Sequence, residues 1–351
     1  MIVVMRERAS DAQVDAVIAR LIDLGVDVHR SSGTTRTVLG VVGAHKVDPA
    51  LIGLLDGVHD VVRISEPYTR ASRTSTPGDT VIPVGQVRVG GRDVIVMAGP
   101  GSAENDEQVM ATAAAVARAG ATVLRGGAFT PRRAAHGFNG LGEAGLQMLR
   151  RGADAHGLLL VSEVTDVNQL DLVARYADIL EVGARHMPHM SLLRELGHSR
   201  TPVVLQRGSA ATVDEWLLAA EHILSAGNPE VILCEGGLRS CEGGTRYAFD
   251  VSSIPLARTL THLPIVANPS HAAGRRDRVA AMARAAVAAG ADGLLIDVHP
   301  DPDHALSDAA QSMALEPFEQ LMGELRLIAS AIGRCIGPSQ ASPERASRGP
   351  A

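Results

Sequence analysis

The feature that most constrains this chain is an alternation of apolar strand patterns and helical patterns that repeats eight times from Asp93 onward. The strand patterns are short apolar runs without polar alternation, as expected for strands that are covered on both faces. Eight such units in about 240 residues are typical of a closed (β/α)8 TIM barrel rather than an open sheet. The expected strands are 94–98, 122–126, 158–164, 179–183, 202–206, 231–235, 264–268 and 293–298.

Residues 1–66 have a different pattern, of class α/β but without the repeat. A strand is followed by an amphipathic helix with Ser10 as its N-cap, two strands, a short helix and a closing strand. This βαββαβ order predicts a ferredoxin-like domain, and small domains of this kind are often regulatory. We expect a linker and capping hairpin over 67–92, the barrel over 93–336 and a disordered tail over 337–351.

Composition excludes several classes of function. The net charge of −6 and the absence of a long basic run argue against a nucleic-acid partner. No apolar segment reaches the roughly 18 residues of a membrane span, and the N-terminus does not read as a signal peptide. Three cysteines without metal-site spacing favour a reduced, cytoplasmic protein without disulfides. Lys46 is the only lysine, so the barrel has neither a Schiff-base lysine nor the lysine of a nucleotide-binding phosphate loop, and no nucleotide cofactor is expected.

Arginines follow several of the expected strands. Because chemistry in such barrels lies at the C-terminal ends of the strands, these side chains should surround one mouth. Arginines beside glycine-rich turns suit a phosphorylated or carboxylated small molecule. The alternative is that they cap helices or pair with acids, since arginine is the common cation of this chain. The arginines concerned are Arg125, Arg132, Arg133, Arg185 and Arg207.

A histidine and two aspartates form a second group at the strand ends. His271 follows the seventh strand, Asp297 ends the eighth, and Asp308 lies in the loop after it. Such a set suits a divalent metal such as Mn²⁺, Fe²⁺ or Zn²⁺, and equally a hydrogen-bonded His–Asp pair that supports the mouth. His186 follows the fourth strand. It is either a catalytic base or metal ligand, or a side chain that only lines the wall of the barrel mouth.

Six motifs together resemble one enzyme family. They are "AGP", "LRGGAFTPR", "GLGEAGL", "GAR", "HLPIVANPSHAAGRRD" and "DVHPDPDHALSDAAQS". They resemble 3-deoxy-7-phosphoheptulonate (DAHP) synthase, in the class with an N-terminal ferredoxin-like domain, from Met1 to about Gly333. The resemblance implies condensation of phosphoenolpyruvate with erythrose 4-phosphate on a divalent metal, in the shikimate pathway of aromatic amino acid biosynthesis. It also implies a homo-oligomer with a feedback-sensing N-terminal domain.

The resemblance assigns the metal to a Cys, a His, a Glu and an Asp. The His and the Asp correspond to His271 and Asp308. Asp297 stands at the Glu position and is one methylene shorter, whereas Gly101 stands at the Cys position and supplies no ligand. Because a metal site tolerates only small errors in distance, we expect a divalent metal (Mn, Fe, Zn or Co) to be bound weakly or not at all.

The resemblance also implies changes in the phosphoenolpyruvate pocket. Arg125 and Arg185 stand at family arginines, and Arg132 at the arginine used for the sugar phosphate. Codon bias against lysine would substitute arginine, so the neutral replacements indicate a real loss of charge, worth about 1.5–3 kcal/mol for each contact. The replacements are Thr130 and Gln206 for two lysines, Gly236 for an arginine, Arg133 for a Thr and Asn268 for an Asp.

These substitutions favour a family member that has diverged to another anionic, sugar-phosphate-like substrate, in specialised metabolism. Its aldol-type or acid–base carbon chemistry would rest on His271, Asp297 and Asp308. Two alternatives remain open. One is a genuine DAHP synthase, and the other is a non-catalytic regulatory or scaffold homologue.

Overall fold

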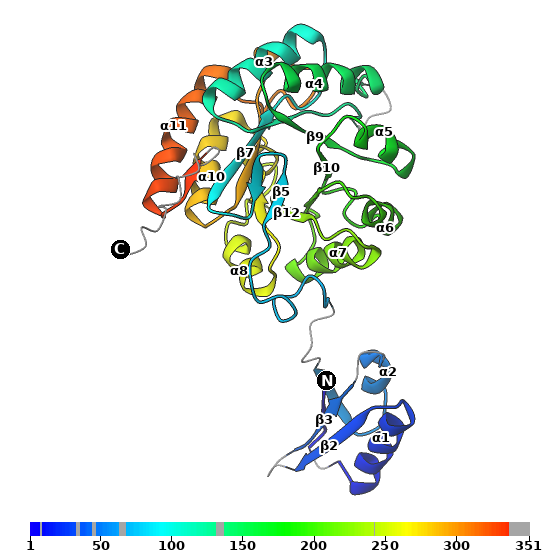
Figure 1. Cartoon of the computed structure of the whole chain (residues 1–351). Helices are drawn as coiled ribbons and strands as arrows, with labels where there is room; N and C mark the ends of the chain where they lie inside the picture. The colour runs from blue at the N-terminus through cyan, green and yellow to red at the C-terminus, as the bar shows by residue number, and fades with distance from the viewer. Residues whose placement is uncertain are drawn as a thin grey trace, which may run out of the picture. The chain divides into compact units, whose positions relative to one another are not determined.

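The computed structural model describes residues 1–7, 9–32, 36–43, 47–62, 68–130, 137–241 and 243–336. Contacts divide the chain into two compact units, Met1–Pro67 and Tyr68–Ala351, which are described separately (Figure 1). Three earlier expectations fall outside the described residues: substrate binding by Arg132 and Arg133, and the disordered tail over 337–351.

The first unit is a four-stranded antiparallel sheet with two helices. The sheet has the strand order β2-β3-β1-β4, and the chain order βαββαβ confirms the predicted ferredoxin-like fold. Helix α1 starts with a capping box, in which Ser10 and Gln13 bind each other's backbone N–H groups. The elements are β1 (Ile2–Met5), α1 (Asp11–Asp23), β2 (Asp27–Ser32), β3 (Thr37–Val42), α2 (Pro49–Gly53) and β4 (Val58–Val62).

The second unit is a closed barrel of eight parallel strands. Each strand pairs with the next along the chain, and β14 pairs with β7 to close the ring. The predicted barrel is therefore confirmed, and no strand end differs from the prediction by more than one residue. The strands are β7 (Asp93–Gly99), β8 (Val123–Arg125), β9 (Leu159–Glu163), β10 (Ile179–Val182), β11 (Val203–Gln206), β12 (Val231–Glu235), β13 (Ile265–Ala267) and β14 (Gly293–Asp297).

Helices surround the strands (Figure 1). Their apolar faces, with Trp216 and Phe318 among the largest fully buried side chains, pack on the outward side chains of the barrel. The short strand β15 (Cys335–Ile336) follows the last helix and pairs with the start of β7. The helices are α3 (Asp106–Ala119), α4 (Glu143–Ala155), η2 (Val167–Gln169), α5 (Leu170–Ala174), α6 (Met190–His198), α7 (Val213–Ala226), α8 (Ser253–Leu260), α9 (Pro269–Ala273), α10 (Arg276–Ala288), η3 (Pro302–His304) and α11 (Leu315–Ala331).

A hairpin closes one end of the barrel. Strands β5 (Ile82–Val84) and β6 (Val87–Val89) pair with each other, and their buried side chains join the apolar cluster that fills the barrel interior. This cluster includes Ile95 near the start of β7 and Val266 in β13. Because the interior is packed with apolar side chains, polar groups are left for the opposite, C-terminal end of the strands. Within the described residues, no helix combines the length and apolarity that crossing a membrane requires.

Candidate active site at the strand ends

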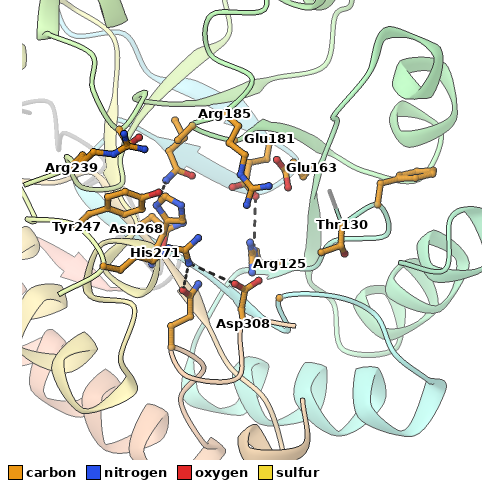
Figure 2. A pocket seen from close by; sticks show the side chains of 18 residues that line it. Arg125, Thr130, Glu163, Glu181, Arg185, Arg239, Tyr247, Asn268, His271 and Asp308 are labelled. Carbon is orange, nitrogen blue, oxygen red and sulfur yellow. Dashed lines mark hydrogen bonds and ion pairs between the residues drawn. The ribbon is translucent and has the colours of Figure 1, made fainter. Parts of the chain in front are cut away.

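A cavity of about 240 Å³ opens where the barrel strands end (Figure 2). It brings together eight of the residues singled out in the sequence: Gly101, Arg125, Thr130, Arg185, Gln206, Asn268, His271 and Asp308. Sequence reasoning missed six others that line it: Glu163, Glu181, Arg239, Arg246, Tyr247 and Gln311. A glutamate at or near the C-terminal end of a mainly apolar strand, as in "LLVSE" of β9 and "ILEV" of β10, is a signal that could have found two of them.

Arg125, the last residue of β8, is held by carboxylates of the protein itself. Its Nη1 donates to Asp297 Oδ1, and its Nε lies 3.9 Å from Glu181 Oε2. Burial works to lower the pKa of Arg125, but the coulombic effects of Asp297 and Glu181 outweigh burial and raise it. The charge of Arg125 is thus largely balanced before any ligand arrives.

Asp297, at the end of β14, lies behind the cavity rather than on its surface and is fully buried. Its Oδ1 accepts from Arg125, and its Oδ2 accepts from Gln311 Nε2. Burial raises the pKa of Asp297, while the guanidinium of Arg125 opposes that rise. Both carboxylate oxygens therefore have protein donors, which favour the ionised form.

Asp308 sits in a turn after β14 with a left-handed backbone, φ 52°, alone in this among the described non-glycine residues. The backbone N–H groups of Gln311 and Ser312 donate to its carbonyl oxygen. A Cβ at Gly101 would lie 3.1 Å from Asp308 Oδ2. A side chain at position 101 would thus face Asp308, as the family resemblance implies for a shared ligand site.

His271 lies in the short helix α9, whose N-cap is Asn268. Asn268 Oδ1 accepts from the His271 backbone N–H at 2.9 Å, so Asn268 also positions the start of the helix. The His271 Nδ1 atom is 2.8 Å from Gln206 Nε2 and 2.9 Å from the Gly236 carbonyl oxygen. Burial, assisted by the charge of Arg246, lowers the pKa of His271 to about 4, so the ring is neutral at pH 7.

The side chain of Gln206 fills the space beside Gly236. A Cβ built on Gly236 would lie 1.9 Å from Gln206 Nε2, so the glutamine amide occupies the space that any side chain at position 236 would need. Gln206 is 2% exposed, and it reaches over Gly236 to the ring of His271. The two neutral residues therefore form one arrangement around the histidine.

The residues that the resemblance assigns to a metal do not fit one in this arrangement. Gly101 has no donor atom, and both oxygens of Asp297 accept hydrogen bonds from protein groups. Within the described residues, no group of three His, Cys, Asp or Glu side chains is placed to hold a metal ion. His271 and Asp308 line the cavity, but the described residues supply no third ligand that would complete a metal site with them.

Three other predicted residues have roles within the protein. Arg207 Nη1 binds Glu235 and Asp250 at 3.1 and 3.0 Å, which agrees with the alternative of pairing with acids rather than with a ligand. His186 Nδ1 lies 3.6 Å from a carboxylate oxygen of Glu163. The Thr130 hydroxyl is 2.7 Å from that of Ser102 and extends a chain of hydroxyl groups at the cavity edge.

Comparisons with known proteins agree with this architecture. Residues 70–330 match the model of the DAHP synthetase I family, and residues 1–66 match the DAHP synthase ferredoxin-like domain. The chain belongs to the DAHP synthase family. It is 42% identical over 334 residues to a phospho-2-dehydro-3-deoxyheptonate aldolase of Thermotoga maritima, an alignment that covers 95% of this chain and 99% of the relative.

Two further comparisons extend the finding. The crystal structure of the Thermotoga maritima DAHP synthase matches with a TM-score of 0.92 and 41% identity, over 96% of this chain and 99% of that one. A 2-dehydro-3-deoxyphosphooctonate aldolase of Syntrophotalea carbinolica is 32% identical over 257 residues, 68% of this chain and 92% of the relative. Membership in the DAHP synthase family makes this chain an aldol-type transferase of a family that acts on phosphorylated small molecules.

Proposed function

We propose that this chain joins a carboxylated donor to a phosphorylated aldose by an aldol-type condensation at the barrel mouth. The observation that carries the proposal is a polar cavity at the strand ends, which four described arginines line. The similarity to a relative named as an aldolase, of which the alignment covers 99%, supports it. Arg185 and Arg239 are exposed at this mouth, where guanidinium groups suit phosphate and carboxylate ligands.

Phosphoenolpyruvate and erythrose 4-phosphate are the first substrates to test. They are the substrates that the family resemblance implies, and identity of 42% over nearly the whole chain supports this pair. Under this hypothesis the protein serves aromatic amino acid biosynthesis as a genuine DAHP synthase.

A second candidate, a donor with less negative charge than phosphoenolpyruvate, is favoured by the neutral residues of the cavity. Gln206 presents an amide, Thr130 a hydroxyl and Gly236 no side chain, where the resemblance implies cations. Three lost charge-assisted contacts of about 1.5–3 kcal/mol each would weaken a trianionic ligand by several orders of magnitude. Such a substrate would place the protein in specialised metabolism.

Weak or absent metal binding belongs to the same proposal. The donors already bound to Asp297 and the missing side chain at Gly101 support it. We also propose, from the resemblance alone, that residues 1–66 sense an effector and that the protein is a cytoplasmic homo-oligomer.

The test supplies erythrose 4-phosphate with either phosphoenolpyruvate or pyruvate, with and without Mn²⁺, and measures released phosphate and the seven-carbon product by mass spectrometry. Phosphate release at a rate ordinary for enzymes, about 1 s⁻¹ or more, identifies the genuine DAHP synthase. Product from pyruvate alone identifies the less charged donor. Failure to bind either phosphorylated compound in calorimetry refutes both candidates and leaves a scaffold homologue.

A further inference from the structure

Glu181 and Glu163 are two carboxylates that face the cavity from neighbouring strands. They are register partners on β10 and β9, and partners on adjacent parallel strands direct their side chains to the same face. Figure 2 shows them side by side on one wall of the cavity. The Glu181 side chain is 4% exposed and that of Glu163 is 23% exposed.

The carboxyl group of Glu181 has no hydrogen-bond donor within the described part of the chain. Its nearest cation, the Arg125 Nε atom, lies 3.9 Å away, which is too far for a hydrogen bond. That Nε–H group is itself buried without a hydrogen-bond partner in the structure. Asp297 on the other side of Arg125 has two donors. The buried Arg125 Nε–H group, which has no hydrogen-bond partner, therefore stands beside a carboxyl group to which the described residues supply no donor, and a buried N–H group of this kind calls for a ligand.

The charges around Glu181 favour a proton on it. Burial raises the pKa of Glu181 to about 7, the guanidinium of Arg125 opposes the rise, and the neighbouring carboxylates add to it. Because Asp297 accepts from two donors and Glu181 accepts from none that the structure describes, the geometry favours Glu181 over Asp297 as the site of a proton. The groups that act on it from the surrounding elements are Arg125 on β8, Glu163 on β9, Cys234 on β12, Asp297 on β14 and Asp308 after β14.

We propose that Glu181 is the acid that protonates the carbonyl oxygen of the aldehyde when the new carbon–carbon bond forms, a role that rests on the proposed function. The C=C π pair of the donor's enol form makes the bond to the carbonyl carbon, the C=O π pair moves to the oxygen, and water adds to the oxygen-bearing donor carbon that is left electron-deficient. The O–H bond of Glu181 breaks, and its proton bonds to that oxygen. The Arg125 Nε–H group donates to the same oxygen and then stabilises the Glu181 carboxylate. The proton that this water loses returns to Glu181 before the next turnover.

The first test compares the wild type with Glu181→Gln, Glu181→Asp and Glu230→Gln. Glu230 precedes β12 at the opposite end of the barrel and also has a pKa that burial raises, so it is the matched control. We expect Glu181→Gln to lower kcat by about 10²–10⁴-fold with KM for erythrose 4-phosphate changed only a few-fold. It should also remove the fall in kcat above pH 7. Glu181→Asp should restore part of the rate, and Glu230→Gln should keep the wild-type rate and pH profile.

The second test needs no turnover. In ¹³C-glutamate-labelled protein, the carboxyl resonance absent from Glu181→Gln is titrated with and without erythrose 4-phosphate. We expect it to titrate near neutral pH and to move upward when the aldehyde binds. The proposal is overturned if Glu181 is ionised throughout pH 5.5–8.5, if the ligand leaves its titration unchanged, or if Glu181→Gln keeps the full rate. Absence of product from both donors refutes the proposed function, and the titration then decides the role of Glu181 alone.

Discussion

Gly236→Ala should disturb the site through Gln206 rather than through the backbone. The new Cβ would lie 1.9 Å from Gln206 Nε2 and 2.7 Å from its Cδ, so the glutamine side chain has to leave its place. It then loses its 2.8 Å contact with His271 Nδ1, and its amide, 2% exposed, has to find another partner. Leaving such a buried group unpaired costs about 1–3 kcal/mol, and we expect the free energy of unfolding of the barrel to fall by that amount.

A double-mutant cycle in urea separates this cause from others. Gln206→Ala removes the obstructing amide, so Gly236→Ala in that background should cost close to nothing. The interaction energy should thus be about 1–3 kcal/mol, with the double variant more stable than the sum of the single losses. Gly243→Ala, in the same loop and with open space around its Cβ, is the matched control and should leave the unfolding midpoint in place. If the single losses add to within about 0.5 kcal/mol, the coupling of the two positions is refuted.

Three further predictions follow from the same cavity. Gly101→Cys with Asp297→Glu should raise the affinity for Mn²⁺ in calorimetry, since the new side chain at 101 would face Asp308, whereas unchanged affinity would mean that the Arg125 pair prevents ligation. The stability difference between the wild type and Glu181→Gln should change by up to about 3 kcal/mol between pH 4.5 and 7 in urea titrations, because folded Glu181 keeps a proton that the unfolded chain releases. His271, whose lowered pKa of about 4 acts in the opposite direction, is present in both proteins and cancels in this difference. Arg125→Ala should lower the free energy of unfolding by about 3–5 kcal/mol, because it leaves buried carboxylates without their cation. Arg185→Ala, at an exposed position, should change it by less than about 0.5 kcal/mol and chiefly weaken phosphate binding. Equal losses of stability in the two variants would contradict this.

The fold could be predicted because its signals are local. Each buried strand is a short apolar run, and the position of a strand end is readable to one residue, as it was for Val231–Glu235. The pairs that decide the chemistry are not local. Arg125 meets Asp297 only because β14 closes on β7 beside β8, and Arg246 reaches Gln311 across 65 residues. Residue type at a strand end therefore predicted which residues line the cavity, but not which of its charges the protein itself neutralises.

Under our proposals, weak metal binding and a proton on Glu181 are two results of one charge balance. Carboxylates from four places surround the cavity floor, and a divalent metal there would offset two of their charges. In the structure Arg125 pairs with Asp297, and the excess negative charge is reduced further when Glu181 holds a proton. The two features should then be exclusive. If Gly101→Cys with Asp297→Glu binds Zn²⁺, the nearby positive charge should lower the pKa of Glu181 well below 7. Glu181 would then be ionised at neutral pH, and the metal-binding variant should lose Glu181 as its general acid.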